Sequence, residues 1–133
     1  MLVTDAAFAA LGDEKFLSLT TFRKSGECVS TPVWVGRDGD ALIVTTPEAS
    51  GKVKRLRNSP RVEVRPCSRF GRVNDGIEPV DAAAELLTAV GGLDRQTGII
   101  REKYGLEFRI VMAIERLSRS GRIHRVILRI TQT

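Results

Sequence analysis

The chain has 133 residues, of which 42% are hydrophobic and 28% are charged. This length suits one domain, which we expect to span residues 1–133, and the composition excludes a disordered chain. No stretch approaches the roughly 18 consecutive apolar residues that cross a bilayer, and the first residues lack the basic start of a secretory signal. We therefore expect no membrane partner and a cytoplasmic location.

Basic residues outnumber acidic ones, with 21 lysines and arginines against 16 aspartates and glutamates and a net charge of +5. This balance favours an anionic partner, either a nucleic acid or a phosphorylated small molecule. An ordinary solvated surface with a mild excess of basic residues explains it equally well. Only 5% of the residues are aromatic, which argues against stacking on single-stranded nucleic acid. We expect a small-molecule ligand and no nucleic-acid partner.

Residues with metal-binding or nucleophilic chemistry are scarce. Two cysteines, Cys28 and Cys67, and the single His124 are too few for a zinc cage or a histidine-based catalytic triad. Without an export signal, both cysteines are expected to be reduced, and Cys67 to have a structural role. No side chain stands out as an acid or base, so we predict no catalytic residue and no metal.

The first half of the chain predicts one short helix and three strands. The helix falls within residues 5–16, which are rich in alanine and interrupted near Gly12. Runs of residues that favour β-strands follow, separated by short turns. The Asp38-Gly39 pair in one of these turns is typical of a tight hairpin. The strands are expected at residues 16–22, 28–35 and 41–46. Such short connections predict an antiparallel meander.

The second half mixes helices with further strands. A helix capped by Ser50 is expected to end before Pro60. Two more helices are expected at residues 94–103 and 108–119. The remaining strands are expected at residues 61–65, 77–87 and 125–130. About six strands with few helices predict a small, β-dominated antiparallel barrel.

The most informative local chemistry lies between Val44 and Lys54. A strand end rich in hydroxyl groups runs through a short loop into a helix whose first turn carries Lys52. A helix N-terminus attracts anions through its unpaired N–H groups, whereas a lysine there opposes the helix dipole unless an anion binds. The pattern indicates a phosphate site at Ser50 and Lys52. A basic surface helix with an ordinary serine cap would show the same pattern.

Two runs of residues carry a family resemblance. The first comprises residues 14–22 together with Ser30-Thr31-Pro32-Val33-Trp34, and the second runs from Ser50 to Val62. Together they resemble the pyridoxamine 5′-phosphate oxidase-like (PPOX-class) split β-barrels that bind flavins, and in particular the branch that depends on the deazaflavin coenzyme F420. Residues 67–72 and Lys103-Tyr104-Gly105 are similar to that branch as well.

The resemblance implies a six-stranded split barrel of the FMN-binding type that works as a homodimer, with cofactor sites at the subunit interface. It also implies the residues around the cofactor: Thr31, Pro32, Val33 and Trp34 beside the ring, Thr45 and Thr46 at the ring and ribityl chain, and Ser50, Gly51 and Lys52 at the phosphate. Trp34 is expected to be half-buried in the core or an interface, with stacking on the cofactor as the alternative.

One departure from the family pattern bears on the cofactor. Members that use flavin mononucleotide (FMN) carry an arginine directly before the phosphate lysine, where this chain has Gly51, and basic residues where it has Pro32-Val33-Trp34. The resemblance therefore implies F420, whose acidic tail would meet the surplus arginines, and hydride transfer between the reduced deazaflavin and an organic substrate. An FMN-binding oxidase-like protein and a non-catalytic cofactor carrier remain open.

Overall fold

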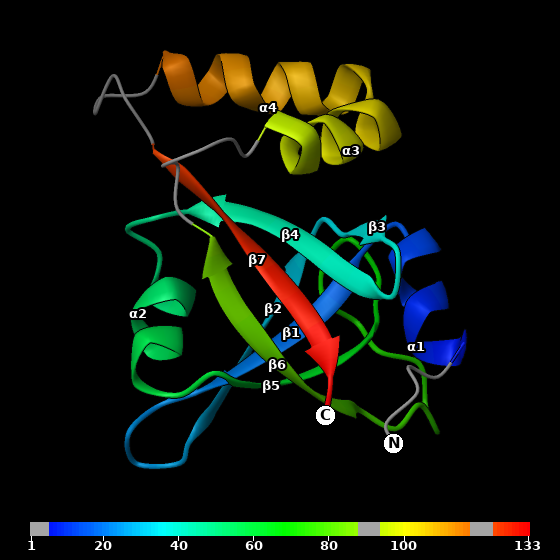
Figure 1. Ribbon diagram of the computed structural model, residues 1–133, viewed down its shortest axis with the longest axis vertical. Helices are drawn as coiled ribbons and strands as arrows, with labels where there is room; N and C mark the ends of the chain where they lie inside the picture. Colours follow the sequence, from blue (N-terminus) through cyan, green and yellow to red (C-terminus); the bar gives the residue numbers. More distant parts are fainter. Residues whose placement is uncertain (1–5, 88–93, 118–123) are drawn as a thin grey trace.

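The described part of the chain holds seven antiparallel strands, which form one sheet in the order β2-β1-β5-β6-β7-β4-β3. The computed structural model describes residues 6–87, 94–117 and 124–133. Its strands are β1 (Leu17–Phe22), β2 (Cys28–Val33), β3 (Gly36–Asp38), β4 (Ala41–Pro47), β5 (Arg61–Pro66), β6 (Val80–Leu87) and β7 (Arg125–Gln132). In Figure 1, β4 and β7 cross over β1 and β2, because the sheet curls back on itself as a split barrel.

Helices cover three sides of this sheet within the described residues. They are α1 (Ala6–Ala10), followed by the 3-10 turn η1 (Leu11–Asp13), α2 (Gly51–Asn58), α3 (Asp94–Tyr104) and α4 (Leu106–Arg116). Figure 1 shows α3 and α4 together above β4, with α2 and α1 on opposite sides of the barrel. Residue 5 of the first predicted helix and residues 118–119 of the last lie outside the described residues.

Strand β4 is buried on both of its faces. Neighbouring side chains of a strand point to opposite sides, so Val44 faces the barrel interior with Leu128, whereas Ile43 faces outward. Ile43 and Ile127 pack there against a cluster from α3 and α4 that contains Ile100, Tyr104 and Phe108. Burying each such side chain contributes about 1.5–3 kcal/mol. The α3–α4 pair is therefore anchored over the outer face of β4 and β7.

The predicted meander is wrong in its third strand. β2 pairs with β1 as expected, but β4 pairs with β3 and β7 and lies toward the opposite edge of the sheet. The strand predicted over residues 28–35 ends at Val33, and residues 36–38 form the additional strand β3, which the predicted Asp38-Gly39 hairpin connects to β4. This added strand gives seven strands instead of six, while the β-dominated split barrel itself is confirmed.

Candidate functional site

A hollow of about 230 Å³ opens between the end of β2, the end of β4 and helix α4. We call it the strand-end hollow. The structure brings six of the nine predicted cofactor residues to its lining, namely Pro32, Val33, Trp34, Thr45, Thr46 and Lys52. Phe16, Val111 and Arg125 line it as well. The lining therefore combines apolar and aromatic side chains with hydroxyl groups and cations.

The other three predicted residues lie outside this lining. Ser50 caps α2, since its Oγ accepts a hydrogen bond from the Val53 N–H at 3.4 Å, and it also lies 3.3 Å from the Thr46 hydroxyl. Gly51 is the first residue of α2. Thr31 lies in β2, and its buried hydroxyl oxygen has no hydrogen-bond partner in the described part of the chain. Ser50 is thus joined to the hollow through Thr46.

Positive charge is concentrated at the first turn of α2. Lys52 is half-buried, and burial, followed by the nearby charges of Arg55 and Arg125, lowers the pKa of its ammonium group. Arg55 folds back along α2, and its Nε donates to the Thr21 hydroxyl at 2.6 Å. A Cβ added to Gly51 would lie 2.7 Å from the Arg55 guanidinium. Arg55 therefore presents a guanidinium beside Gly51, which suits an anion at this helix end.

Trp34 is half-buried, as expected, and belongs to an aromatic cluster under α3 and α4. Its ring stacks on Tyr104 with centroids 4.7 Å apart and an interplanar angle of 18°. The Phe108 ring lies at 6.1 Å on a tilted approach. Aromatic contacts at these distances are favourable beyond the area they bury. The aromatic wall of the strand-end hollow is consequently held by helices that come much later in the sequence.

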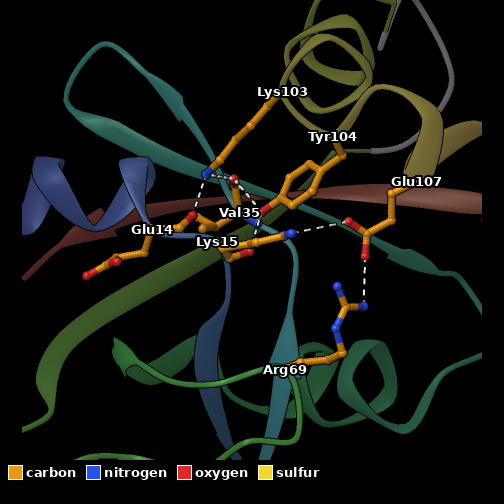
Figure 2. A network of polar contacts seen from close by, with 7 residues as sticks. All are labelled: Glu14, Lys15, Val35, Arg69, Lys103, Tyr104 and Glu107. Atoms are coloured by element: carbon orange, nitrogen blue, oxygen red, sulfur yellow. Dashed lines mark hydrogen bonds and ion pairs between the residues drawn. The ribbon is translucent and has the colours of Figure 1, made fainter.

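Lys103 and Tyr104 form hydrogen bonds to the backbone of Val35, which lies between β2 and β3, as Figure 2 shows. The Lys103 ammonium donates to the carbonyl oxygens of Val35 at 2.7 Å and Gly12 at 2.8 Å, and also to that of Glu14. The Tyr104 hydroxyl donates to the Lys15 carbonyl at 2.6 Å and accepts from the Val35 N–H at 3.0 Å. Burial raises the pKa of Tyr104 to about 12, so the phenol is neutral at ordinary pH.

Arg125 of β7 was predicted only as the first residue of the last strand, yet it lines the strand-end hollow. Its Nε donates to Glu115 at 3.0 Å, and a second guanidinium nitrogen bonds the other oxygen of the same carboxylate. A third nitrogen lies 3.5 Å from the Thr45 hydroxyl. Two parallel bonds to one carboxylate fix the orientation of the guanidinium. No local sequence signal pairs these two residues, because the bond spans two separate elements.

Comparison with known proteins decides the family. The family model described as pyridoxamine 5′-phosphate oxidase matches residues 3–132. The chain belongs to this family. The resemblance carried by residues 14–22, 30–34 and 50–62 is thereby confirmed. No curated protein matches the chain.

Solved structures of similar fold accompany this match. An FAD-binding protein from Mesorhizobium loti has a TM-score of 0.67 at 18% identity, over 98% of this chain and 88% of its own. An F420 reductase has a TM-score of 0.62 at 17% identity, over 98% and 96%. A pyridoxamine 5′-phosphate oxidase-related, FMN-binding protein from Nostoc punctiforme has a TM-score of 0.56 at 14% identity, over 99% and 81%. At these identities the likeness establishes the fold.

Metal-binding and nucleophilic chemistry is scarce in the described residues of this pyridoxamine 5′-phosphate oxidase-family chain. Within them, no three His, Cys, Asp or Glu side chains gather as a metal site, and no helix is long and apolar enough to cross a membrane. Burial raises the pKa of the Cys67 thiol, which keeps it protonated and weakly reactive. The strand-end hollow and its cationic edge bring together most of the residues that the family resemblance assigns to a cofactor.

Proposed function

We propose that this member of the pyridoxamine 5′-phosphate oxidase family is an oxidoreductase that binds coenzyme F420 at the strand-end hollow and transfers hydride between it and a small organic substrate. One observation carries the proposal. Pro32, Val33 and Trp34 line the same hollow as Thr45, Thr46 and Lys52, so apolar surface, hydroxyl groups and a cation meet at one place. A flat ring with an anionic side chain needs such a surface for the ring and cations for the phosphate.

The chain's own residues would divide the work of binding. Lys52 and Arg55 would hold the phosphate together with the N–H groups of the first turn of α2. Pro32 and Val33 would keep water from one ring face, while the hydroxyls of Thr45 and Thr46 offer hydrogen bonds to polar ring and ribityl atoms. The bound deazaflavin would supply the hydride chemistry, and the protein its orientation and a dry surface.

The choice of F420 over FMN rests on the wall of the hollow. Arg55 reaches the position beside Gly51, so the guanidinium that Gly51 cannot supply comes from one turn later in α2. The Pro32-Val33-Trp34 segment, by contrast, carries no basic group. Relatives of similar fold include an F420 reductase, an FAD-binding protein and an FMN-binding protein, so the family alone selects none of these cofactors.

A homodimer is part of the proposal. The strand-end hollow, at about 230 Å³, is smaller than the roughly 300–1,000 Å³ of a typical small-molecule site. Helix α4 also exposes an apolar stripe of Leu106, Ile110 and Ile114, which are 72%, 50% and 63% exposed. Side chains four residues apart share one helix face. We propose that a second copy covers this stripe and completes the site.

A non-catalytic cofactor carrier is the second candidate function. It is favoured because no carboxylate, histidine or cysteine lines the strand-end hollow within the described residues. Turnover separates the two functions. Oxidation of reduced F420 in the presence of a candidate acceptor, and dependent on the protein, would support the oxidoreductase. Binding without turnover over a panel of acceptors would support the carrier.

A side-by-side titration of oxidised F420 and FMN tests the cofactor. We expect F420 to bind at least about tenfold more tightly, which corresponds to about 1.4 kcal/mol. Equal affinities, or a yellow protein that copurifies with FMN, would contradict the choice of F420 and favour the FMN-binding alternative.

A further inference from the structure

A second and larger hollow, of about 750 Å³, lies between helices α3 and α4 and the ends of β4 and β7. We call it the arginine hollow, because Arg101, Arg109, Arg116 and Arg125 all line it and Glu115 is the one carboxylate among the described residues of its lining. Its size falls within the roughly 300–1,000 Å³ of small-molecule sites. The chain thus holds a concave surface large enough for a ligand apart from the strand-end hollow.

The charge of the arginine hollow is largely uncompensated. Arg125 is paired with Glu115, as described above. Among the described residues, Arg109 and Arg116 form no ion pair, and Arg101 contacts the Phe108 ring at 5.7 Å. Arg109 and Arg116 lie two turns apart on α4, so they belong to the same side of the helix. Like charges gathered in one concavity repel one another and attract anions.

Apolar side chains complete the same lining. Phe108 is buried, Met112 is half-buried, and the exposed Ala113 adds a small apolar surface. Thr45 and Thr97 provide hydroxyl groups. A site that combines several guanidinium groups with apolar side chains favours an organic anion with an apolar body over inorganic phosphate, which would leave the apolar side chains unused.

Thr45 and Arg125 line both hollows, so the two spaces adjoin. The Glu115 carboxylate holds Arg125 at this junction. We infer that the arginine hollow binds the substrate of the proposed reaction, and that this substrate is an organic anion with at least two negative groups on an apolar body. The statement that this ligand is the substrate rests on the proposed function. The statement that the hollow binds an anion depends only on the residues that line it.

Calorimetric titration with 2,6-naphthalenedicarboxylate, a rigid aromatic dianion, tests the site in the cofactor-free protein. We expect Arg109→Gln and Arg116→Gln each to weaken binding by about fivefold or more, because each removes a charge-assisted hydrogen bond. The matched control is Arg57→Gln, which removes the same charge from the exposed last turn of α2. It should change the affinity by less than about twofold. The neutral dimethyl ester should bind at least about tenfold more weakly.

Two results overturn the anion site. Equal losses in the hollow variants and in Arg57→Gln would mean that the dianion senses only the overall charge of the surface. Equal affinities for the dianion and its ester would mean that only apolar contacts bind it. Unchanged melting temperatures are expected for all three variants, since each replaces an exposed side chain.

A repeat of the titration with F420 at saturation separates the substrate from the acidic tail of the cofactor. A dianion affinity within about threefold of the cofactor-free value supports a separate substrate site. A loss of more than about tenfold would show that the cofactor tail fills the arginine hollow, and would overturn the substrate assignment. Dianion binding by a protein that fails to bind F420 would support the anion site and overturn the proposed function.

Discussion

Tyr104 stacks on Trp34 and, through its hydroxyl group, accepts a hydrogen bond from the N–H of the next residue, Val35. One side chain at the end of α3 therefore sets both the aromatic wall of the strand-end hollow and the backbone that follows it. Val35 is 0% exposed, so its N–H has no access to water if this partner is lost. The shape of the hollow consequently depends on a contact between residues far apart in the sequence.

Replacing Tyr104 with Phe should lower the free energy of unfolding by about 1–3 kcal/mol, because it leaves the buried Val35 N–H without a partner while keeping the stacked ring. Urea denaturation followed by Trp34 fluorescence measures the change. The matched control is Phe108→Tyr, which changes a hydroxyl group in the same aromatic cluster without touching Val35. A loss below about half a kcal/mol in Tyr104→Phe would show that the hydrogen bond contributes little.

The same phenol predicts a loss of stability in alkali. Burial raises the pKa of Tyr104 from 10.0 to about 12 in the folded protein. Between these two values the unfolded chain has released a proton that the folded chain still holds, so stability falls as pH rises. Below pH 10 the Tyr104 phenol is protonated in both the folded and the unfolded chain, so its full contribution to the free energy of unfolding is present. The difference between the urea midpoints of wild type and Tyr104→Phe should therefore shrink from pH 10 to pH 12, and a constant difference would contradict the raised pKa.

Lys52→Ala should weaken cofactor binding by about ten- to a hundredfold, because it removes a charge-assisted hydrogen bond to the phosphate. The melting temperature of the cofactor-free protein should stay the same or rise, since Arg55 and Arg125 lie near the Lys52 ammonium. Lys54→Ala is the control, because Lys54 is exposed and lies about 200° further around the helix. An unaltered affinity in Lys52→Ala would remove the phosphate site from α2.

Arg55→Met tests the guanidinium beside Gly51. It should weaken cofactor binding by about tenfold through the lost phosphate contact, and lower stability by about 1–3 kcal/mol because the buried Thr21 hydroxyl loses its donor. Arg57→Met serves as the control, since Arg57 is exposed in the same helix. Reduced stability with unchanged cofactor affinity would assign Arg55 a purely structural role.

Ile110→Lys should convert the proposed homodimer into a monomer, because it places a charge in the middle of the exposed apolar stripe of α4. Light scattering at micromolar protein measures the mass. Ile77→Lys is the matched control, because Ile77 is 38% exposed in the loop before β6 and lies outside α4. A monomeric wild-type protein would contradict the proposed homodimer. It would also contradict the proposal that a second copy completes the site.

Local chemistry accounts for what was predicted correctly about the fold. The serine cap at Ser50 and the end of α2 before Pro60 follow from interactions within a few residues, so the sequence pattern was sufficient. Strand β3 and the partner of β4 were missed because they depend on distant contacts. Gly36 lies so close to α3 that an added Cβ would be 2.9 Å from Ile99, and the sequence around residues 34–38 carries no sign of this.

The candidate site likewise contains residues that could be predicted from the sequence and residues that could not. Six of its residues were expected to lie together through the family resemblance, whereas no periodicity in the sequence relates Trp34 to Thr45 or Lys52. Arg125 was missed because its position depends on the carboxylate of Glu115, which belongs to another element. The arginine hollow escaped notice for a related reason, since its cations come from two helices and one strand and converge only after folding.

Strand β7 lies between β6 and β4 in the sheet, although these strands are remote from it in the sequence, with Thr45 opposite Ile127. The pairing that joins the two halves of the sheet is thus between segments far apart in the chain, and such distant pairing forms slowly, in about milliseconds to seconds. Until β7 docks, β4 and β6 each present an open strand edge, which another chain can pair with. We therefore expect slower docking of β7 to leave more of the newly made protein open to aggregation.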